Sequence, residues 1–168
     1  MIIVHAHWRD PVEVKTSERE MDKRSGITGP WQNAPEVPGV YAFLKQDGGA
    51  GAKPFHVGQS NNVQGRLYSY IKQDNSVAEH IRKLLAKGER VFFLPCSVGI
   101  EEAGKTTPLP KADCKPILDK VEIALISHLN AGGHELINVA NTKNVYQLSF
   151  EQNQFSSWSP SKLRVPMS

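Results

Sequence analysis

The sequence has little cysteine, no long apolar run and only a small excess of charge of one sign. Its 168 residues include two cysteines, Cys96 and Cys114, which are too few for a disulfide framework and match no zinc-binding spacing. No apolar run approaches the roughly 18 residues of a membrane span. The apolar start of the chain ends at Arg9 and Asp10, too early for a secretory signal. We therefore expect reduced thiols and a cytoplasmic protein with no membrane partner.

The charge balance allows a polyanionic partner without requiring one. Lysine and arginine total 20 against 17 acidic residues, a net charge of +3. The most basic stretch lies between residues 61 and 90, where it includes Arg66, Lys72 and Arg90. A solvated helix surface is the simpler interpretation for the cluster 82–87 within it. Charge alone therefore leaves nucleic-acid binding as one hypothesis among others.

The periodicity of apolar residues predicts alternating groups of strands and helices. A hydrophobic content of 39% and a charged content of 22% are typical of a globular protein with one core. The predicted strands are residues 2–8, 40–46, 55–58 and 90–98, and the predicted helices are 60–73, 76–88 and 116–130. Pro95 favours an edge position or a bulge for the last strand. Five prolines or glycines and several charges predict an exposed loop over 99–116.

This order predicts an α/β (α+β) fold with a small central antiparallel sheet of three strands, flanked by helices. Residues 1–37 are expected to form an N-terminal extension with one strand, a charged segment and a loop rich in proline and glycine. Residues 38–144 are expected to form the main domain. The tail, 145–168, is expected to pack on that domain or to be partly loose.

Five residues within the main domain are candidates for a functional site. Tyr41 and His56 lie on the two strands of a predicted hairpin, and Arg66 and Tyr70 lie one turn apart on the next helix. Glu122 lies beside the apolar stripe of the last helix, where a carboxylate needs a partner. Structural alternatives exist for each: a half-buried tyrosine, a neutral core histidine and an Arg66–Glu122 ion pair.

The stretch PGVYAFL, followed after a glycine-rich link by FHVGQSNNVQGRL, resembles the core of the GIY-YIG nuclease family. Residues 39–41 match the first tripeptide with Val for Ile, and residues 56–58 match the second with His for Tyr and Val for Ile. Arg66 matches the arginine on the following helix, and Glu122 matches the glutamate on a later helix. The family's asparagine corresponds to Asn138 or, less well, to Asn141. The resemblance covers about residues 38–141.

The resemblance implies a metal-dependent endonuclease that hydrolyses DNA phosphodiester bonds. Glu122 would bind Mg²⁺ or Mn²⁺, Arg66 would hold the phosphate, and Tyr41 would orient or deprotonate the attacking water. His56 departs from the family's tyrosine. With an ordinary pKa of about 6.5, it would support or share the proton transfer near neutral pH. The residues expected to contact substrate are Gly58, Gln59, Ser60, Tyr70 and Asn138.

Three alternatives remain compatible with the same residues. A catalytically degenerate member of the family would bind nucleic acid through Arg66 and the basic helix without cutting it. A toxin-like or effector nuclease would use the same site with a different partner surface. An α/β interaction domain without nuclease activity would use Arg66 and Glu122 only as an ion pair.

Overall fold

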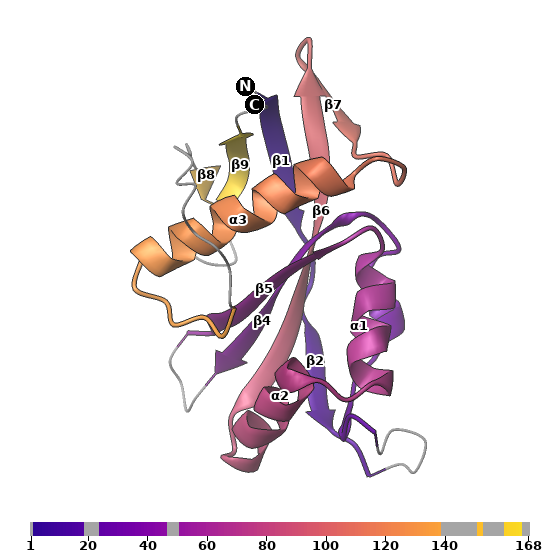
Figure 1. Ribbon diagram of the computed structural model, residues 1–168, viewed down its shortest axis with the longest axis vertical. Coiled ribbons are helices and arrows are strands. Elements are labelled where there is room, and N and C mark those ends of the chain that lie inside the picture. The colour runs from indigo at the N-terminus through magenta and orange to yellow at the C-terminus, as the bar shows by residue number, and fades with distance from the viewer. Residues whose placement is uncertain (1, 19–23, 47–50, 139–150, 153–159, 166–168) are drawn as a thin grey trace.

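The computed structural model describes residues 2–18, 24–46, 51–138, 151–152 and 160–165 (Figure 1). The helices of this part are a short 3-10 helix (Trp31–Asn33), α1 (Val63–Lys72), α2 (Ser76–Ala86) and α3 (Lys115–Ala131). Its strands are β1 (Ile2–Trp8), β2 (Val12–Thr16), β3 (Ile27–Thr28), β4 (Gly39–Gln46), β5 (Lys53–Ser60), β6 (Arg90–Glu102), β7 (Lys105–Pro108), β8 (Glu151–Gln152) and β9 (Pro160–Val165).

The long strand β6 is the centre of the sheet. It pairs antiparallel with β4 on one side, and with β1 and β2 on the other. The predicted trio is present in the order β5–β4–β6, and the α+β class is confirmed. The predicted size is wrong, because the strands of the described residues join into one nine-stranded sheet. The strands that were not predicted are short or charged, so their apolar alternation is weak.

The chain on both sides of the predicted main domain contributes to this sheet. β1 and β2 pair with β6, so residues 2–8 and 12–16 share the sheet of the predicted main domain. β9, from the predicted tail, pairs antiparallel with β1. These pairings join segments that are far apart in the sequence, so local sequence patterns do not predict them.

Pro95 lies in the middle of the central strand, where the sequence favoured an edge or a bulge. It is the register partner of Tyr41 in β4, and its carbonyl accepts a hydrogen bond of 2.8 Å from the Arg9 N–H. Arg9 lies in the gap between the end of β1 and the start of β2. In a strand, the N–H and C=O of one residue point to the same side. The nitrogen of Pro95, which has no hydrogen to donate, therefore faces this gap. No strand-to-strand hydrogen bond is lost there.

The predicted exposed loop over 99–116 is wrong in its first half. β6 continues to Glu102 and turns into β7, with which it pairs from Gly99↔Pro108 to Glu102↔Lys105. Ala103 and Gly104 both have positive φ angles, 49° and 76°, as a two-residue hairpin turn of the primed type requires. The glycines that suggested a loop therefore serve this hairpin: Gly104 in the turn, and Gly99 where β7 approaches closely.

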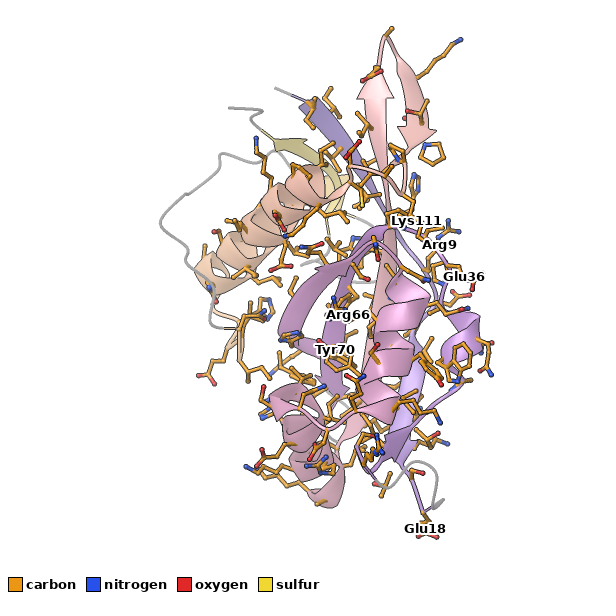
Figure 2. The ribbon with its side chains drawn as sticks, turned by 45° about the vertical axis from the view of Figure 1, so that its right-hand side comes forward. Arg9, Glu18, Glu36, Arg66, Tyr70 and Lys111 are labelled. Atoms are coloured by element: carbon orange, nitrogen blue, oxygen red, sulfur yellow. The ribbon has the colours of Figure 1, made fainter. Side chains whose placement is uncertain are left out.

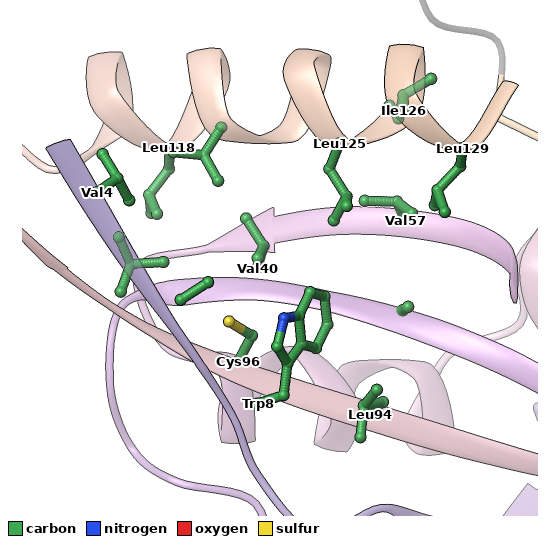
Figure 3. Packing of buried hydrophobic residues seen from close by; sticks show 14 of the residues in the cluster. Val4, Trp8, Val40, Val57, Leu94, Cys96, Leu118, Leu125, Ile126 and Leu129 are labelled. Atoms are coloured by element: carbon green, nitrogen blue, oxygen red, sulfur yellow. The ribbon is translucent and has the colours of Figure 1, made fainter. Parts of the chain in front are cut away.

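The helices cover both faces of the sheet and bury two apolar clusters. α3 packs Leu118, Leu125 and Leu129 against Val40 of β4 and Val57 of β5 (Figure 3). On the other face, α1 and α2 bury their own apolar stripes against β4 and β6. Among the strands that the structure describes, β5 pairs with β4 alone, so it forms an edge of the sheet.

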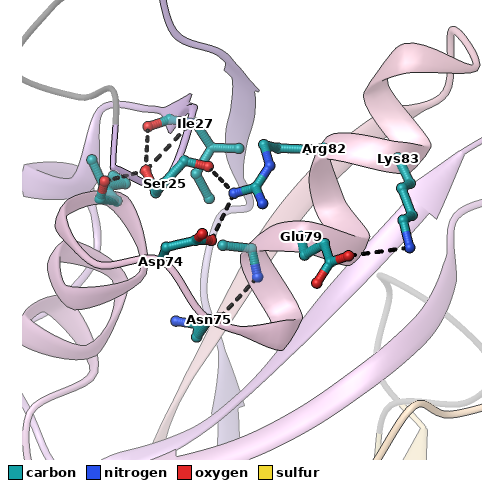
Figure 4. Close-up of polar contacts among 9 residues, drawn as sticks. Ser25, Ile27, Asp74, Asn75, Glu79, Arg82 and Lys83 are labelled. Carbon is teal, nitrogen blue, oxygen red and sulfur yellow. Dashed lines mark hydrogen bonds and ion pairs between the residues drawn. The ribbon is translucent and has the colours of Figure 1, made fainter.

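Side-chain caps and ion pairs hold α1 and α2 in place. The side chain of Asn62 accepts a hydrogen bond of 3.0 Å from the Gly65 N–H, so Asn62 is the N-cap among the three predicted candidates. Arg82 of α2 contacts the Ser25 carbonyl and lies 2.8 Å from Asp74 (Figure 4). Arg82 therefore has a structural role. Among the described residues, no helix has the length and apolar character that would let it span a membrane.

Candidate functional site

The β4–β5 hairpin brings Tyr41 and His56 to the sheet face that α1 covers. Tyr41 pairs in register with Gly58, while His56 pairs with Phe43, so the two candidate side chains are diagonal neighbours. Their ring centroids lie 6.2 Å apart. The two side chains therefore approach each other across the hairpin, as expected, although His56 lies two residues from Gly58, the direct partner of Tyr41.

The two glycines of the matched tripeptides are required by close packing. A Cβ atom at Gly58 would lie 2.2 Å from the Tyr41 hydroxyl oxygen, and a Cβ at Gly39 would lie 2.0 Å from the Cys96 carbonyl oxygen. Both separations are far inside van der Waals contact. Glycine at position 58 therefore makes room for the Tyr41 ring, and glycine at 39 lets β4 lie against β6.

A chain of hydrogen bonds links three of the candidate residues. The hydroxyls of Tyr41 and Tyr70 are 2.8 Å apart, and the Tyr70 hydroxyl is 3.4 Å from His56 Nε2. Tyr41 and Tyr70 expose only 3% and 8% of their surface. Within the described residues, His56 Nδ1 is buried without a hydrogen-bond partner. The chain joins β4, α1 and β5, so the relative positions of these groups depend on the packing of all three elements.

Burial keeps all three groups of this chain neutral near pH 7. It raises the pKa of Tyr41 far above its ordinary value, with a further rise from Tyr70, and it also raises the pKa of Tyr70. Burial, assisted by the positive charge of Arg66, lowers the pKa of His56 to about 4. The expected pKa of about 6.5 is therefore wrong for His56, and its ring acts at neutral pH as a hydrogen-bonding group.

We expect the stability of the protein to fall in mild acid because of His56. Its folded-state pKa of about 4 lies below the ordinary histidine pKa of about 6.5, which the unfolded chain keeps. Between these values the unfolded chain binds more protons, so the free energy of unfolding decreases as pH falls through this window. A shift of this size corresponds to about 3 kcal/mol at most. Urea unfolding of the wild type and of His56→Gln, near neutral pH and in mild acid, measures the effect.

The His56→Gln variant should lose less stability between the two pH values than the wild type. Other groups that titrate in the same window, such as His128, are common to both proteins and cancel in the comparison. An equal loss in the two proteins would contradict the neutral, buried state of His56.

Arg66 extends from α1 with an exposed side chain that the fold leaves available. Within the described residues it forms no ion pair with Glu122 or with another carboxylate, so the predicted structural ion pair is not formed. Its charge nevertheless affects the pKa values of Tyr41, His56 and Glu122. The guanidinium is thus near these groups and available to an anion.

Glu122 is half-buried on α3, and its pKa is raised. Burial is the largest cause and the negative charge of Asp119 adds to it, while Lys115 and Arg66 act in the opposite direction. Among the described residues, its carboxylate has no hydrogen bond or ion pair. A half-buried carboxylate without a partner, beside a second carboxylate, suits a hard divalent cation that takes one or two carboxylates and keeps several waters.

The cation site would be sparse in protein ligands. The part of the chain that the structure describes contains no group of three or more His, Cys, Asp or Glu residues arranged to hold a metal. Glu122 is therefore the candidate ligand, with most of the coordination supplied by water and substrate oxygen.

The remaining predicted contact residues are held by hydrogen bonds of their own. Asn138 closes the free edge of β5: its Oδ1 accepts from the Val57 N–H at 2.8 Å, and its Nδ2 donates to the Val57 carbonyl at 2.6 Å. Ser60 donates to the Asn62 carbonyl at 2.8 Å and shapes the turn before α1. Gln59 donates to Asp119 at 2.6 Å. Asn141 lies outside the described residues.

Sequence reasoning missed Asp119, Lys115 and Lys111. Lys115 lies 2.9 Å from Asp119, one helical turn away, and Asp119 also binds Gln59 of β5. The spacing of Lys115 and Asp119 was a visible signal for a helical ion pair. Their position beside β5 depends on how α3 packs against the sheet. The spacing of two residues within one helix gives no information about that packing.

An open cleft of about 600 Å³ lies beside Arg66 (Figure 2). The end of β5 and the start of α1 form one wall, and the segment that leads into α3 forms the other. The lining residues are Gln59, Ser60, Asn61, Arg66, Lys111, Asp113, Cys114, Lys115 and Pro116. Arg66 thus belongs both to this cleft and to the cluster of Tyr41, His56 and Glu122.

Taken together, the site offers a cation, a carboxylate and a chain of neutral hydrogen-bonding groups at one edge of the sheet. Such a combination can bind a phosphate, hold a divalent cation and orient a water molecule. Comparison with known proteins found no matching family model, no matching curated protein and no matching solved structure. The functional conclusion therefore depends on the site itself and on the resemblance of its two tripeptides.

Proposed function

We propose that the protein is a metal-dependent endonuclease of the GIY-YIG type that hydrolyses DNA phosphodiester bonds. The observation that carries the proposal is the convergence of Tyr41, His56, Arg66 and Glu122, which come from four different elements. Within the described residues, the arginine and the glutamate have no ion-pair partners. For the half-buried Glu122, an unpaired carboxylate costs stability, so a purely structural role does not explain it.

Arg66 is proposed to bind the non-bridging oxygens of the scissile phosphate. Its planar guanidinium offers a fork of donors that matches two phosphate oxygens, and its charge is permanent. Phosphodiester hydrolysis builds negative charge on these oxygens, so a cation held in position stabilises the transition state more than the ground state.

Glu122 is proposed to hold Mg²⁺ or Mn²⁺. When bound, such a cation stabilises charge on phosphate oxygens and lowers the pKa of water. The raised pKa of Glu122 reflects the cost of an uncompensated half-buried charge, and a positive ion would offset that cost.

The neutral chain of Tyr41, Tyr70 and His56 is proposed to orient the attacking water. Both tyrosines keep their protons at neutral pH because burial raises their pKa values. They act through hydrogen bonds, since neither is anionic enough to take a proton by itself. His56 Nε2 lies 3.4 Å from the Tyr70 hydroxyl, so the two groups can share a hydrogen bond that restrains this hydroxyl.

Cleavage of a supercoiled plasmid with Mg²⁺ or Mn²⁺ tests the proposal. The wild-type protein should nick the plasmid, and Arg66→Ala should lower the rate by about 10²–10³-fold, the usual cost of removing one group that stabilises the transition state. Lys87→Ala is the matched control, because it removes one exposed positive charge just after α2. Equal rates for Arg66→Ala and Lys87→Ala would contradict the proposed role of Arg66.

The second candidate function is DNA binding without cleavage. The departure at position 56, together with the low pKa of His56, favours it, because no group of the hydrogen-bonded chain is a strong base near pH 7. This function predicts binding that weakens steeply with salt and no cleavage with either metal. Neither binding nor cleavage would instead favour the α/β interaction domain.

A further inference from the structure

The cleft beside Arg66 combines positive charge with polar walls. Its charged lining residues are Arg66, Lys111 and Lys115 against Asp113, a balance of three cations to one anion. Within the described residues, Lys111 has no ion-pair partner, while Lys115 shares its charge with Asp119. We propose that this cleft binds the DNA backbone phosphate next to the scissile phosphate. This inference rests on the proposed function.

The position of Arg66 connects the two phosphates. Its guanidinium lies within the electrostatic range of Glu122 and His56, and it also lines the cleft. A strand whose scissile phosphate contacts Arg66 would continue into the cleft, where its next phosphate meets Lys111 on the opposite wall. Figure 2 shows Lys111 above Arg66, beside the start of α1. The cleft therefore sets the path of the strand as it leaves the cluster.

The size and lining of the cleft suit a piece of nucleic-acid backbone. A volume of about 600 Å³ lies within the range of about 300–1,000 Å³ usual for small-molecule sites. Such a space accommodates a sugar with its phosphate, which a single small ion would not fill. Gln59, Ser60 and Asn61 add polar groups to the lining, which can form hydrogen bonds with sugar and phosphate oxygens.

With such a second phosphate-binding position, the protein should prefer a substrate strand that carries at least two phosphates. Arg66 acts on the reacting phosphate, and Lys111 positions the strand through the neighbouring one. Loss of Lys111 should therefore weaken DNA binding without changing the chemistry of a substrate that has a single phosphate.

Binding of a short fluorescent DNA duplex in EDTA tests the inference without any cleavage. One phosphate contact contributes about 0.9 to the slope of log affinity against log salt, so Lys111→Ala should lower that slope by about 0.9. The same relation predicts a loss of affinity of about eightfold at about 0.1 M salt. Lys87→Ala, with the same change of charge just after α2, should bind like the wild type. Lys111→Ala binding like Lys87→Ala would overturn the inference.

Hydrolysis of bis(4-nitrophenyl) phosphate with Mn²⁺ separates this inference from the proposed function. This diester has one phosphate, so Lys111→Ala should hydrolyse it at the wild-type rate, while Arg66→Ala should not. A wild-type protein that cuts neither the diester nor DNA would refute the proposed function, and the binding experiment in EDTA would still decide whether the cleft binds DNA. A diester rate that falls in Lys111→Ala would contradict a role confined to the neighbouring phosphate.

Discussion

The Glu122→Gln variant is expected to lose metal-dependent DNA cleavage while remaining folded. Glutamine has nearly the same shape but no negative charge, so it cannot replace a carboxylate as the ligand of a hard cation. The rate with Mg²⁺ or Mn²⁺ should fall by at least about 10²–10³-fold, as for loss of other groups that stabilise the transition state. Plasmid nicking over time measures the loss, and calorimetric titration with Mn²⁺ should show weakened binding in parallel.

The stability of Glu122→Gln distinguishes a functional glutamate from a structural one. Burial and Asp119 raise the pKa of Glu122, so its charged form costs more free energy in the folded protein than in the unfolded chain. A neutral glutamine removes this cost, and the variant should be at least as stable as the wild type near pH 7. Glu135→Gln is the matched control, since it makes the same change at an exposed position beyond α3. Full activity in Glu122→Gln, or activity lost equally in both variants, would exclude Glu122 as the metal ligand.

Gly39→Ala is expected to destabilise the protein by about 3 kcal/mol or more, as overpacking of a well-packed site does. The new Cβ would lie 2.0 Å from the Cys96 carbonyl oxygen and 3.1 Å from a methyl group of Val63. The first neighbour is backbone of the central strand, so it cannot move aside as the end of a flexible side chain would. Urea denaturation measures the change. The midpoint should fall sharply, with little change in the slope.

Gly51→Ala is the control for this prediction. No atom lies within 4 Å of a Cβ at Gly51, so the substitution should leave stability unchanged or slightly raised through the unfolded chain. If Gly39→Ala were as stable as Gly51→Ala, the observed contact between β4 and β6 would be wrong. Gly39 is in the first matched tripeptide, so its replacement would also disturb β4, the strand that carries Tyr41.

Local patterns were enough to predict the elements that carry the site. Apolar alternation indicated β4 and the middle of β5, and the 3.6-residue period indicated α1, α2 and α3. Asn62 was among the predicted caps because a short polar side chain before an apolar stripe satisfies free N–H groups of the first turn. The hairpin after Gly99 was missed because glycine and proline occur in turns within sheets as well as in exposed loops.

The identity of the candidate residues was also contained in the sequence, but their chemical states were not. Glu122 stood out as a carboxylate beside an apolar stripe, and Arg66 as a base one turn before Tyr70. The pKa of His56 could not be predicted from position, because burial determines it and burial depends on α1 packing over the hairpin. The surroundings of Lys111 and Asp119 could not be predicted either. Local patterns place Lys111 in a loop and Asp119 on a helix surface, and only the packing of α3 brings them to the site.

By itself, the sequence determined which segments form strands and helices and which residues differ from the pattern around them. These are properties of neighbouring residues, and the periods of helix and strand express them directly. Only the tertiary structure decided that β6 joins β4 to β1 and β2, that Arg66 and Glu122 remain without ion-pair partners within the described residues, and that Lys111 and Arg66 line the same cleft. These depend on contacts between segments far apart in the chain, where burial and electric field, which no local pattern encodes, set the charge and exposure of each group.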